Sequence, residues 1–251
     1  MSSEHILETR GLTKEFKGFV AVKNVGLRVR RGTIHALIGP NGAGKTTCFN
    51  LLTKFLVPTA GAIFFKDVDI TRARPADIAR RGVIRSFQIS AVFPHLTVME
   101  NVRVALQRKL GNSYQFWRSD RVLNELNEQA LELLRAVDLA DLAATVTVEL
   151  PYGRKRALEI ATTLAMDPEL MLLDEPTAGM GHEDVDRVTN LIKAVSKGRT
   201  VLMVEHNMSV VSGISDRITV LQRGAILAEG PYAEVSRNPQ VMEAYMGTEH
   251  A

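Results

Sequence analysis

Short apolar runs separated by longer mixed segments are the first feature of the chain. Nearly every position in these runs is apolar, which is typical of parallel strands covered on both faces of a sheet. The segments between them repeat apolar residues at helical spacing, so strands and helices alternate as in an α/β core. The runs occupy residues 34–38, 170–173 and 201–204.

A different pattern precedes the first run. Leu27 and Val29 alternate with Arg28 and Arg30, and this period of two predicts a half-exposed strand. Strands of that kind belong to antiparallel sheets with one face toward water. We therefore expect an antiparallel β layer beside the α/β core.

Helical spacing predicts one helix between the first two runs and two more later in the chain. The first follows the candidate N-cap Ser119 and lies in a helical insert of about residues 89–165, between the halves of the α/β core. The second ends before Gly198, and the third begins near Pro239 and includes residues 241–246. The apolar positions of the first two are Leu123, Leu126, Ala130, Leu133 and Val137, then Val185, Val188, Leu191, Ile192 and Val195.

Composition favours one compact unit. The chain has 251 residues, 45% of them apolar and 24% charged, which is enough for a buried core. No apolar stretch approaches the ~20 residues of a bilayer-crossing helix, and residues 1–10 lack the apolar segment of a secretory signal. The single cysteine, Cys48, cannot form an internal disulfide, which agrees with a reducing compartment. We expect cytosolic residence, with any membrane role peripheral.

A glycine-rich segment follows the first apolar run. It fits the pattern G-x-x-x-x-G-K-[ST] between a buried strand and a helix predicted over residues 47–55. Its glycines let backbone N–H groups turn toward phosphate oxygens, Lys45 would neutralise the outer phosphates, and Thr46 would place its hydroxyl on Mg²⁺. A glycine-rich turn with a chance lysine is the alternative. The predicted nucleotide-binding residues here are Gly39, Pro40, Asn41, Gly42, Ala43, Gly44, Lys45, Thr46 and Thr47.

Two acids follow the second apolar run. Asp174 and Glu175 stand at the carboxyl end of a predicted strand, the edge where open α/β sheets bind ligands. By position, Asp174 would hold the Mg²⁺ shell and Glu175 would polarise the attacking water. The alternative, an exposed acidic turn after a strand, is common in isolation.

Four further positions carry a resemblance to a known family. They are Phe16, Gln88 after Arg85-Ser86-Phe87, His206 in Val204-Glu205-His206, and the segment 150–154. With the loop and the acids, they make the whole chain resemble the ATP-binding subunits of ABC transporters. The resemblance implies that Phe16 stacks on adenine, that Gln88 reaches both Mg²⁺ and the attacking water, and that His206 contacts the γ-phosphate.

The segment 150–154 stands where that family carries its LSGGQ signature, which contacts the ATP of the facing subunit. The resemblance assigns this role to Pro151, Tyr152, Gly153 and Arg154. Pro151 replaces the serine that donates to the γ-phosphate, so that hydrogen bond cannot form. Proline suits the first turn of a helix, here predicted over residues 153–165, so the Gly153 N–H and the helix dipole could still bind phosphate. Gly181, where the family usually has Asp or Asn, puts cross-dimer contacts there in doubt.

Four local features narrow the resemblance within the family. They are the L-x-Y-G form of the signature, residues 178–180 after the acids, residues 204–208, and a tail N-P-x-V-x-x-A-Y-x-G at 238–247. In combination they resemble the larger ATP-binding protein of branched-chain amino acid importers.

This resemblance implies a fold, cofactors and partners. The fold would be a P-loop NTPase core with a mostly parallel sheet, an antiparallel β layer and a helical subdomain, in one ABC ATPase domain spanning residues 1–251. The cofactors would be ATP and Mg²⁺. The partners would be permease subunits, a second ATP-binding subunit, the same or related, in a head-to-tail dimer, and indirectly an extracytoplasmic solute-binding protein. The chain would then lie on the cytoplasmic face of the inner membrane.

Other functions stay open at this point. A small-molecule kinase or synthetase would need an acceptor lid and no signature-like helix start, so residues 150–154 and His206 argue against it. ABC ATPases of DNA repair or translation usually carry fused duplicates or long coiled coils. Importers of urea or amides and lipid exporters are disfavoured only by the subfamily features. The net charge of +3 favours anionic partners, but ATP alone would satisfy it, so no nucleic acid is inferred.

Overall fold

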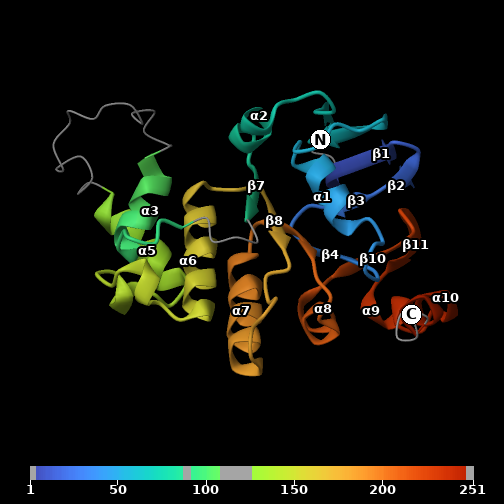
Figure 1. Cartoon of the computed structure of the whole chain (residues 1–251). Coiled ribbons are helices and arrows are strands. Elements are labelled where there is room, and N and C mark those ends of the chain that lie inside the picture. Colours follow the sequence, from blue (N-terminus) through green and yellow to red (C-terminus); the bar gives the residue numbers. More distant parts are fainter. Residues whose placement is uncertain (1–3, 87–91, 108–125, 247–251) are drawn as a thin grey trace. The chain divides into compact units, whose positions relative to one another are not determined.

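The three apolar runs form neighbouring strands at the centre of a parallel sheet (Figure 1). These strands, β4 (Ile34–Ile38), β8 (Leu170–Asp174) and β9 (Thr200–Val204), are buried at every position, as expected for strands covered on both faces. The strand order begins β11-β10-β4-β9-β8. In it, β10 (Arg217–Gln222) runs parallel to β4, and β11 (Ala225–Gly230) runs antiparallel at the edge. The α/β prediction is confirmed.

The computed structural model describes residues 4–86, 92–107 and 126–246. The chain divides into two compact units. The first comprises residues 1–83, 169–176 and 196–251, and the second comprises residues 84–168 and 177–195. The strand β7 (Val83–Ser86) carries the chain from the first unit into the second.

An antiparallel sheet forms the second layer of the first unit. The alternating residues 27–30 contribute β3 (Arg28–Arg30), which pairs antiparallel with β1, so the predicted β layer is confirmed. Lys17 and Gly18 both have positive φ at the turn between β1 and β2, as tight hairpin turns require. The remaining strands are β1 (His5–Phe16), β2 (Phe19–Val25), β5 (Ala60–Phe65) and β6 (Val68–Asp69).

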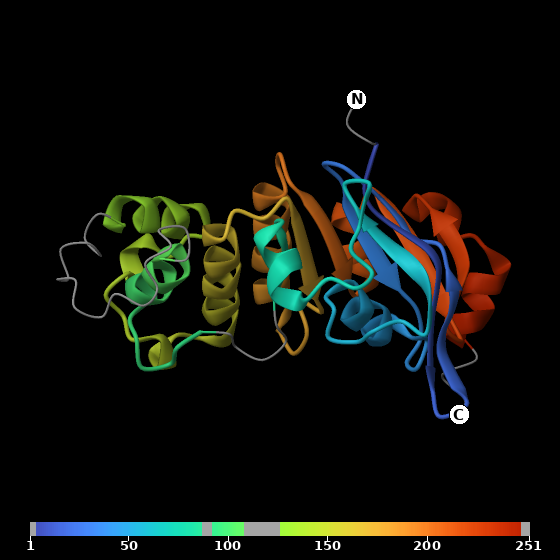
Figure 2. The same ribbon diagram turned by 90° about the horizontal axis from the view of Figure 1, so that it is seen from above.

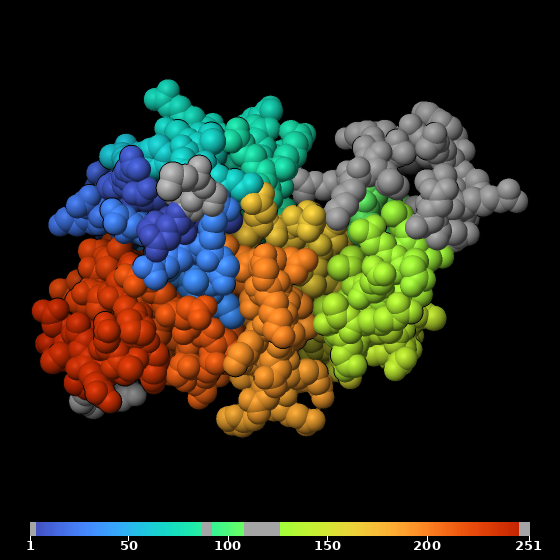
Figure 3. Space-filling view, turned by 180° about the vertical axis from the view of Figure 1, so that it is seen from behind, coloured from blue at the N-terminus to red at the C-terminus, as the bar shows by residue number. Residues whose placement is uncertain are grey.

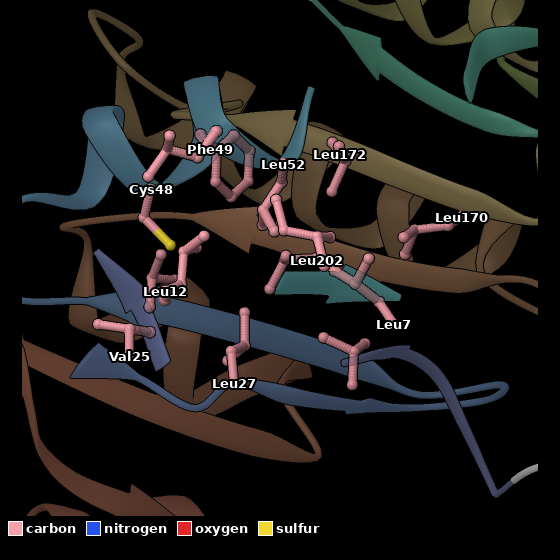
Figure 4. Close-up of a cluster of buried hydrophobic side chains, with 14 of the residues drawn as sticks. Leu7, Leu12, Val25, Leu27, Cys48, Phe49, Leu52, Leu170, Leu172 and Leu202 are labelled. Atoms are coloured by element: carbon pink, nitrogen blue, oxygen red, sulfur yellow. The ribbon is translucent and has the colours of Figure 1, made fainter. Parts of the chain in front are cut away.

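The helix α1 (Lys45–Leu52) supplies the centre of the core (Figure 4). Its Cys48, Phe49 and Leu52 are fully buried, in one cluster with leucines of both sheets. Each such apolar side chain stabilises the fold by roughly 1.5–3 kcal/mol on burial. The core therefore fixes the start of α1 relative to β4. The labelled residues from the sheets and the loop between them are Leu7, Leu12, Val25, Leu27, Leu170, Leu172 and Leu202.

Short helices complete the first unit. Those after β9 lie at the carboxyl-terminal part of the chain, coloured orange to red beside the blue amino-terminal strands in Figure 3. The predicted tail helix is confirmed as α10. The helices are α2 (Pro75–Arg80), α8 (Met208–Ile214), α9 (Tyr232–Val235) and α10 (Pro239–Met246).

The second unit is helical among its described residues apart from its share of β7. Its helices α3, α5 and α6 lie side by side (Figure 2). A reciprocal pair of bonds between Thr97 and Glu100 caps the start of α3, as in a capping box. The bounds are α3 (Val98–Gln107), α5 (Asn127–Ala136), α6 (Tyr152–Ala165) and α7 (His182–Val195), with single 3₁₀ turns at Ala140–Leu142 and Thr147–Glu149.

The helix predictions for this unit hold where the structure describes them. Spacing around residues 123–137 predicted α5, although Ser119 and Leu123 lie outside the described residues. The helix predicted over 185–195 is α7, and Gly198 with φ 76° follows its end. Among the described helices of the whole chain, none is both long and apolar enough to cross a bilayer.

Candidate nucleotide site

The glycine-rich loop connects β4 to α1, as its sequence predicted. Residues 39–44 form the loop, and Lys45, Thr46 and Thr47 are the first residues of α1. Gly39 has a φ of 149° and Gly44 a φ of 101°. A Cβ on Gly39 would lie 2.2 Å from a backbone oxygen, and one on Gly44 would lie 2.5 Å from another. Only glycine fits at these two positions, so the loop's shape is fixed by its sequence.

A backbone hydrogen bond from the β10–β11 turn holds the outer side of the loop. The Gly224 N–H donates to the Ala43 carbonyl at 3.0 Å, and the Lys23 N–H of β2 donates to the Gly224 carbonyl at 2.7 Å. The turn therefore ties the loop to the antiparallel layer. Sequence reasoning missed this support, because nothing local to residues 222–224 indicates which loop they contact.

Lys45 is the charged group at the centre of the loop. Its ammonium donates to the carbonyls of Gly39 at 2.6 Å and Pro40 at 3.0 Å. Burial lowers its pKa, and the negative charge of Glu175 opposes that shift. A largely buried cation at the start of a helix attracts phosphate oxygens strongly.

The two predicted acids lie at the carboxyl end of β8 in the same unit as the loop. Asp174 is the last residue of β8 and is completely buried. Glu175 has a φ of 45°, a left-handed conformation that is uncommon for non-glycine residues and characteristic of functional sites. Its N–H donates to the Val204 carbonyl of β9 at 2.9 Å. Of the two neighbouring acids, Asp174 is therefore buried and Glu175 is half-exposed.

His206 follows β9, at the same edge of the parallel sheet. The buried Glu205 carboxylate accepts from the N–H groups of His206 at 2.8 Å and Asn207 at 3.0 Å. Asn207 in turn caps α8 by accepting from the Ser209 N–H. These two residues fix the backbone and leave the His206 side chain exposed. Sequence reasoning did not assign them, although an asparagine just before a helix is a recognisable cap signal.

Phe16 ends β1 at the tip of the β1–β2 hairpin. Its side chain is 41% exposed, so its ring is accessible to a stacking partner. The Lys14 ammonium lies 5.0 Å from the ring centroid, within cation–π distance. The exposed ring fits the predicted adenine contact, which stays a prediction.

The signature-like segment begins α6 in the second unit. Pro151 is the N-cap, and the helix starts at Tyr152, one residue before the predicted start. A Cβ on Gly153 would lie 2.6 Å from the Asp184 carboxylate, so a larger residue there would require the Asp184 side chain to move. Arg154 pairs with Asp138 at 2.8 Å. The nucleotide contacts assigned to this segment stay predictions.

Gln88 lies outside the described residues, so its predicted roles are untested. The side chains suited to Mg²⁺ are the Thr46 hydroxyl and the Asp174 carboxylate, both oxygen ligands. No group of three or more His, Cys, Asp or Glu in the described residues could hold a metal ion. That small donor set fits Mg²⁺, which proteins bind through one or two side chains together with substrate phosphates.

The site combines a strand, a glycine-rich loop with its lysine, a helix, and two acids at the end of a nearby parallel strand. This combination defines a P-loop nucleoside triphosphatase. A family model described as "ABC transporter" matches residues 22–178, and one described as "Branched-chain amino acid ATP-binding cassette transporter" matches residues 225–251. The chain belongs to the ABC transporter family, as an ATP-hydrolysing cassette.

Full-length relatives agree with the family models. The chain is 40% identical to the high-affinity branched-chain amino acid transport ATP-binding protein BraF of Pseudomonas aeruginosa, covering 98% of this chain and 99% of that protein. It is 39% identical to LivG of Escherichia coli, of the same description, with the same coverage.

Solved structures share the fold along nearly the whole chain. An ABC transporter cassette in its ADP conformation is 30% identical, with a TM-score of 0.86, over 98% of this chain and 100% of that one. A nucleotide-free cassette is also 30% identical, with a TM-score of 0.84, over 96% of this chain and 98% of that one. The predicted ABC ATPase fold is therefore confirmed.

Proposed function

We propose that this chain powers an importer of branched-chain amino acids. The observation that carries the proposal is the match of residues 225–251 to a family model of branched-chain amino acid cassettes. Relatives at 39–40% identity carry the same solute in their names. Other subunits select the solute. The solute assignment therefore rests on sequence similarity to these relatives and not on the nucleotide site.

The proposed mechanism begins with phosphate binding by the loop. The N–H groups of residues 41–46 and the start of α1 receive the phosphates, and Lys45 moves its hydrogen bonds from Gly39 and Pro40 to phosphate oxygens. Phe16 stacks on the adenine. The loop thereby positions the γ-phosphate in front of the carboxyl ends of β8 and β9.

Water attack is assigned to Glu175 and His206. The Glu175 carboxylate, half-exposed and directed by its left-handed backbone, accepts a hydrogen bond from the attacking water and aligns it. The exposed His206 contacts the γ-phosphate. Gln88 would complete this set.

The proposed Mg²⁺ ligands are the Thr46 hydroxyl and the Asp174 carboxylate, with Gln88 as a further one. The ion supplies charge neutralisation of the phosphates when bound. Burial of Asp174 at the end of β8 holds its carboxylate in place.

The assembly we propose is a head-to-tail pair of cassettes. In it, Gly153 and its neighbours Pro151, Tyr152 and Arg154 contact the nucleotide held by the loop of a second cassette, and the whole chain acts as one ATPase domain. A solved cassette 26% identical to this chain is described as dimeric with ADP and phosphate, which supports the pairing. Permease subunits would hold the pair at the cytoplasmic face of the membrane, with a solute-binding protein acting from the other side.

The test is solute-stimulated ATP hydrolysis by the complete transporter in vesicles. The genes encoding the partners are co-expressed with this chain, and leucine, isoleucine and valine are compared with urea and a short amide, each with the binding protein. We expect the branched-chain amino acids to stimulate hydrolysis and the others not to. Stimulation by urea or the amide alone would overturn the solute assignment and leave the ATPase assignment intact.

A further inference from the structure

The amide side chain of Asn101, on α3, joins two segments of the second unit that are far apart in the sequence. Asn101 is only 2% exposed, on a helix face that is otherwise formed by Val98, Val102 and Leu106. Its Nδ2 donates to the hydroxyl of Thr147, itself buried, at 2.9 Å. A buried amide is costly unless its polar atoms are hydrogen-bonded, so its partners identify the segments that it holds together.

The other bonds of this amide hold the segment that precedes α3. Its Oδ1 accepts from the Phe93 N–H at 2.7 Å. The two N–H groups of Nδ2 are shared between Thr147 and the carbonyls of Phe93 at 3.1 Å and Thr97 at 3.0 Å. The Thr147 hydroxyl donates in turn to the Leu96 carbonyl at 2.8 Å. The amide thereby fixes the turn before α3, and the threonine hydroxyl joins that turn to the later segment.

Backbone and side-chain hydrogen bonds continue from Thr147 to the start of α6. The Val148 N–H donates to the Pro94 carbonyl at 2.9 Å, and the Leu150 N–H donates to the Thr147 carbonyl at 3.2 Å. The Lys155 ammonium of α6 donates back to the Val148 carbonyl at 3.0 Å. A continuous series of contacts therefore connects the buried amide on α3 to the signature-like segment at the start of α6.

We propose that Asn101 is a positioning residue, which acts through Thr147 to hold the signature-like segment where it contacts the nucleotide of a second cassette. Asn101 itself touches no nucleotide. A helix start that is already fixed loses less conformational freedom when the second cassette binds. This role rests on the head-to-tail assembly proposed above. It should affect pairing of the cassettes and leave nucleotide binding by the phosphate loop, which belongs to the other compact unit, unchanged.

The variant that isolates the bridging hydroxyl is Thr147→Val, since valine keeps the branched shape of the side chain. It is placed in a Glu175→Gln background to retain ATP, and pairing with the second cassette is measured by sedimentation. We expect the dissociation constant for ATP-driven pairing to rise about three- to tenfold per variant chain, the range of one net hydrogen bond. The Kd for MgATP of the single chain should stay the same. Thr147→Ser keeps the hydroxyl and should restore pairing.

The matched control is Thr163→Val, within α6 of the same unit. Thr163 is also buried, and its hydroxyl also donates to a backbone carbonyl, that of Glu159, at 2.8 Å. This variant should pair as the parent does. Amide hydrogen exchange locates the effect, because Thr147→Val should accelerate exchange at Val148 and Leu150 while the amides of α5 keep their rates.

The asparagine itself is tested in a double-mutant cycle. Asn101→Leu should weaken pairing at least as much as Thr147→Val does, and combining the two should add little, because both break the same contact. Additive losses would overturn the role of Asn101. If Asn101→Leu does not fold, the threonine variants decide the proposal.

Unchanged pairing in Thr147→Val would overturn the proposal and leave the proposed function intact. So would an equal loss in Thr163→Val that follows the melting temperatures of the two variants. Failure of the Glu175→Gln parent to pair in ATP would instead overturn the head-to-tail assembly, and this inference with it.

Discussion

The Lys45 ammonium donates to the Gly39 carbonyl across the mouth of its own loop, at 2.6 Å. The side chain that is to bind phosphate is therefore already held over the loop by the loop's first residue. Loop shape and lysine position are consequently parts of one arrangement, which the following substitutions test separately.

Replacing the lysine should weaken nucleotide binding itself. Lys45→Ala removes the charged donor, and loss of charge-assisted bonds to phosphate should raise the Kd for MgATP roughly 10- to 100-fold. Isothermal titration of the full chain measures this. The matched control is Lys54→Ala, because Lys54 is also buried and bonds a backbone carbonyl, that of Thr71, away from the loop. Unchanged affinity in Lys45→Ala would contradict the phosphate role of the loop.

Replacing the second acid should separate binding from turnover. Glu175→Gln keeps the size of the side chain but removes the carboxylate that aligns water, so ATP binding should persist while hydrolysis falls at least about 100-fold. The measurement is phosphate release by the assembled transporter alongside nucleotide binding. Glu234→Gln on α9, an exposed glutamate of the same unit, serves as the control. A Glu175→Gln transporter with the wild-type rate would remove Glu175 from the mechanism.

The sequence predicted those parts of this site that depend on local patterns. Buried runs gave β4, β8 and β9 almost to the residue, because strands covered on both faces must be apolar throughout. The helix after the loop was predicted over 47–55 but spans Lys45–Leu52. The helix starts earlier because the backbone becomes helical immediately after Gly44. It ends earlier because Lys54 takes a φ of 65°, which is not helical.

Contacts between distant residues could not be predicted in this way. No periodicity in the sequence indicates that Gly224 donates to the Ala43 carbonyl or that Asp184 approaches Gly153. The left-handed backbone of Glu175 is also unexpected, since a residue before proline normally prefers extended conformations. These features arise from the packing of whole elements, and local propensity does not encode them.

Acid should destabilise the fold through His35, a buried residue of β4. Burial lowers its pKa to about 4, Glu229 opposes the shift, and Arg217 adds to it. Its Nε2 contacts the Thr219 hydroxyl at 2.8 Å. The folded-state pKa lies below the unfolded value near 6.5, so His35 stays neutral in the folded chain while the unfolded chain takes up a proton. The free energy of unfolding is therefore unaffected by this titration above pH 6.5. It decreases as pH falls toward 4, by at most about 1.4 kcal/mol per pH unit.

Denaturant unfolding at pH 7.5 and pH 5 tests this linkage. His35→Gln removes the titration, so the variant should lose less unfolding free energy between the two values than the wild type does. The comparison uses the change with pH, and any constant cost of the substitution cancels. Equal losses in both proteins would show that other groups govern the acid response.

The thiol of Cys48 should be unreactive while the phosphate-loop helix is folded. Cys48 is fully buried, and burial raises its pKa to about 12 from the ordinary thiol value of 9.0, which applies in the unfolded chain. At pH 8 the thiolate fraction in the folded chain is then lower by about a thousandfold, and a thiol reagent also cannot reach the buried sulfur.

Labelling of Cys48 with a chromogenic disulfide should therefore follow opening of the core, and MgATP should slow the labelling further by stabilising the folded state. Because Cys48 is the single cysteine of the chain, the absorbance reports one site. Rapid labelling under native conditions, unaffected by nucleotide, would mean that α1 does not close the core around the site.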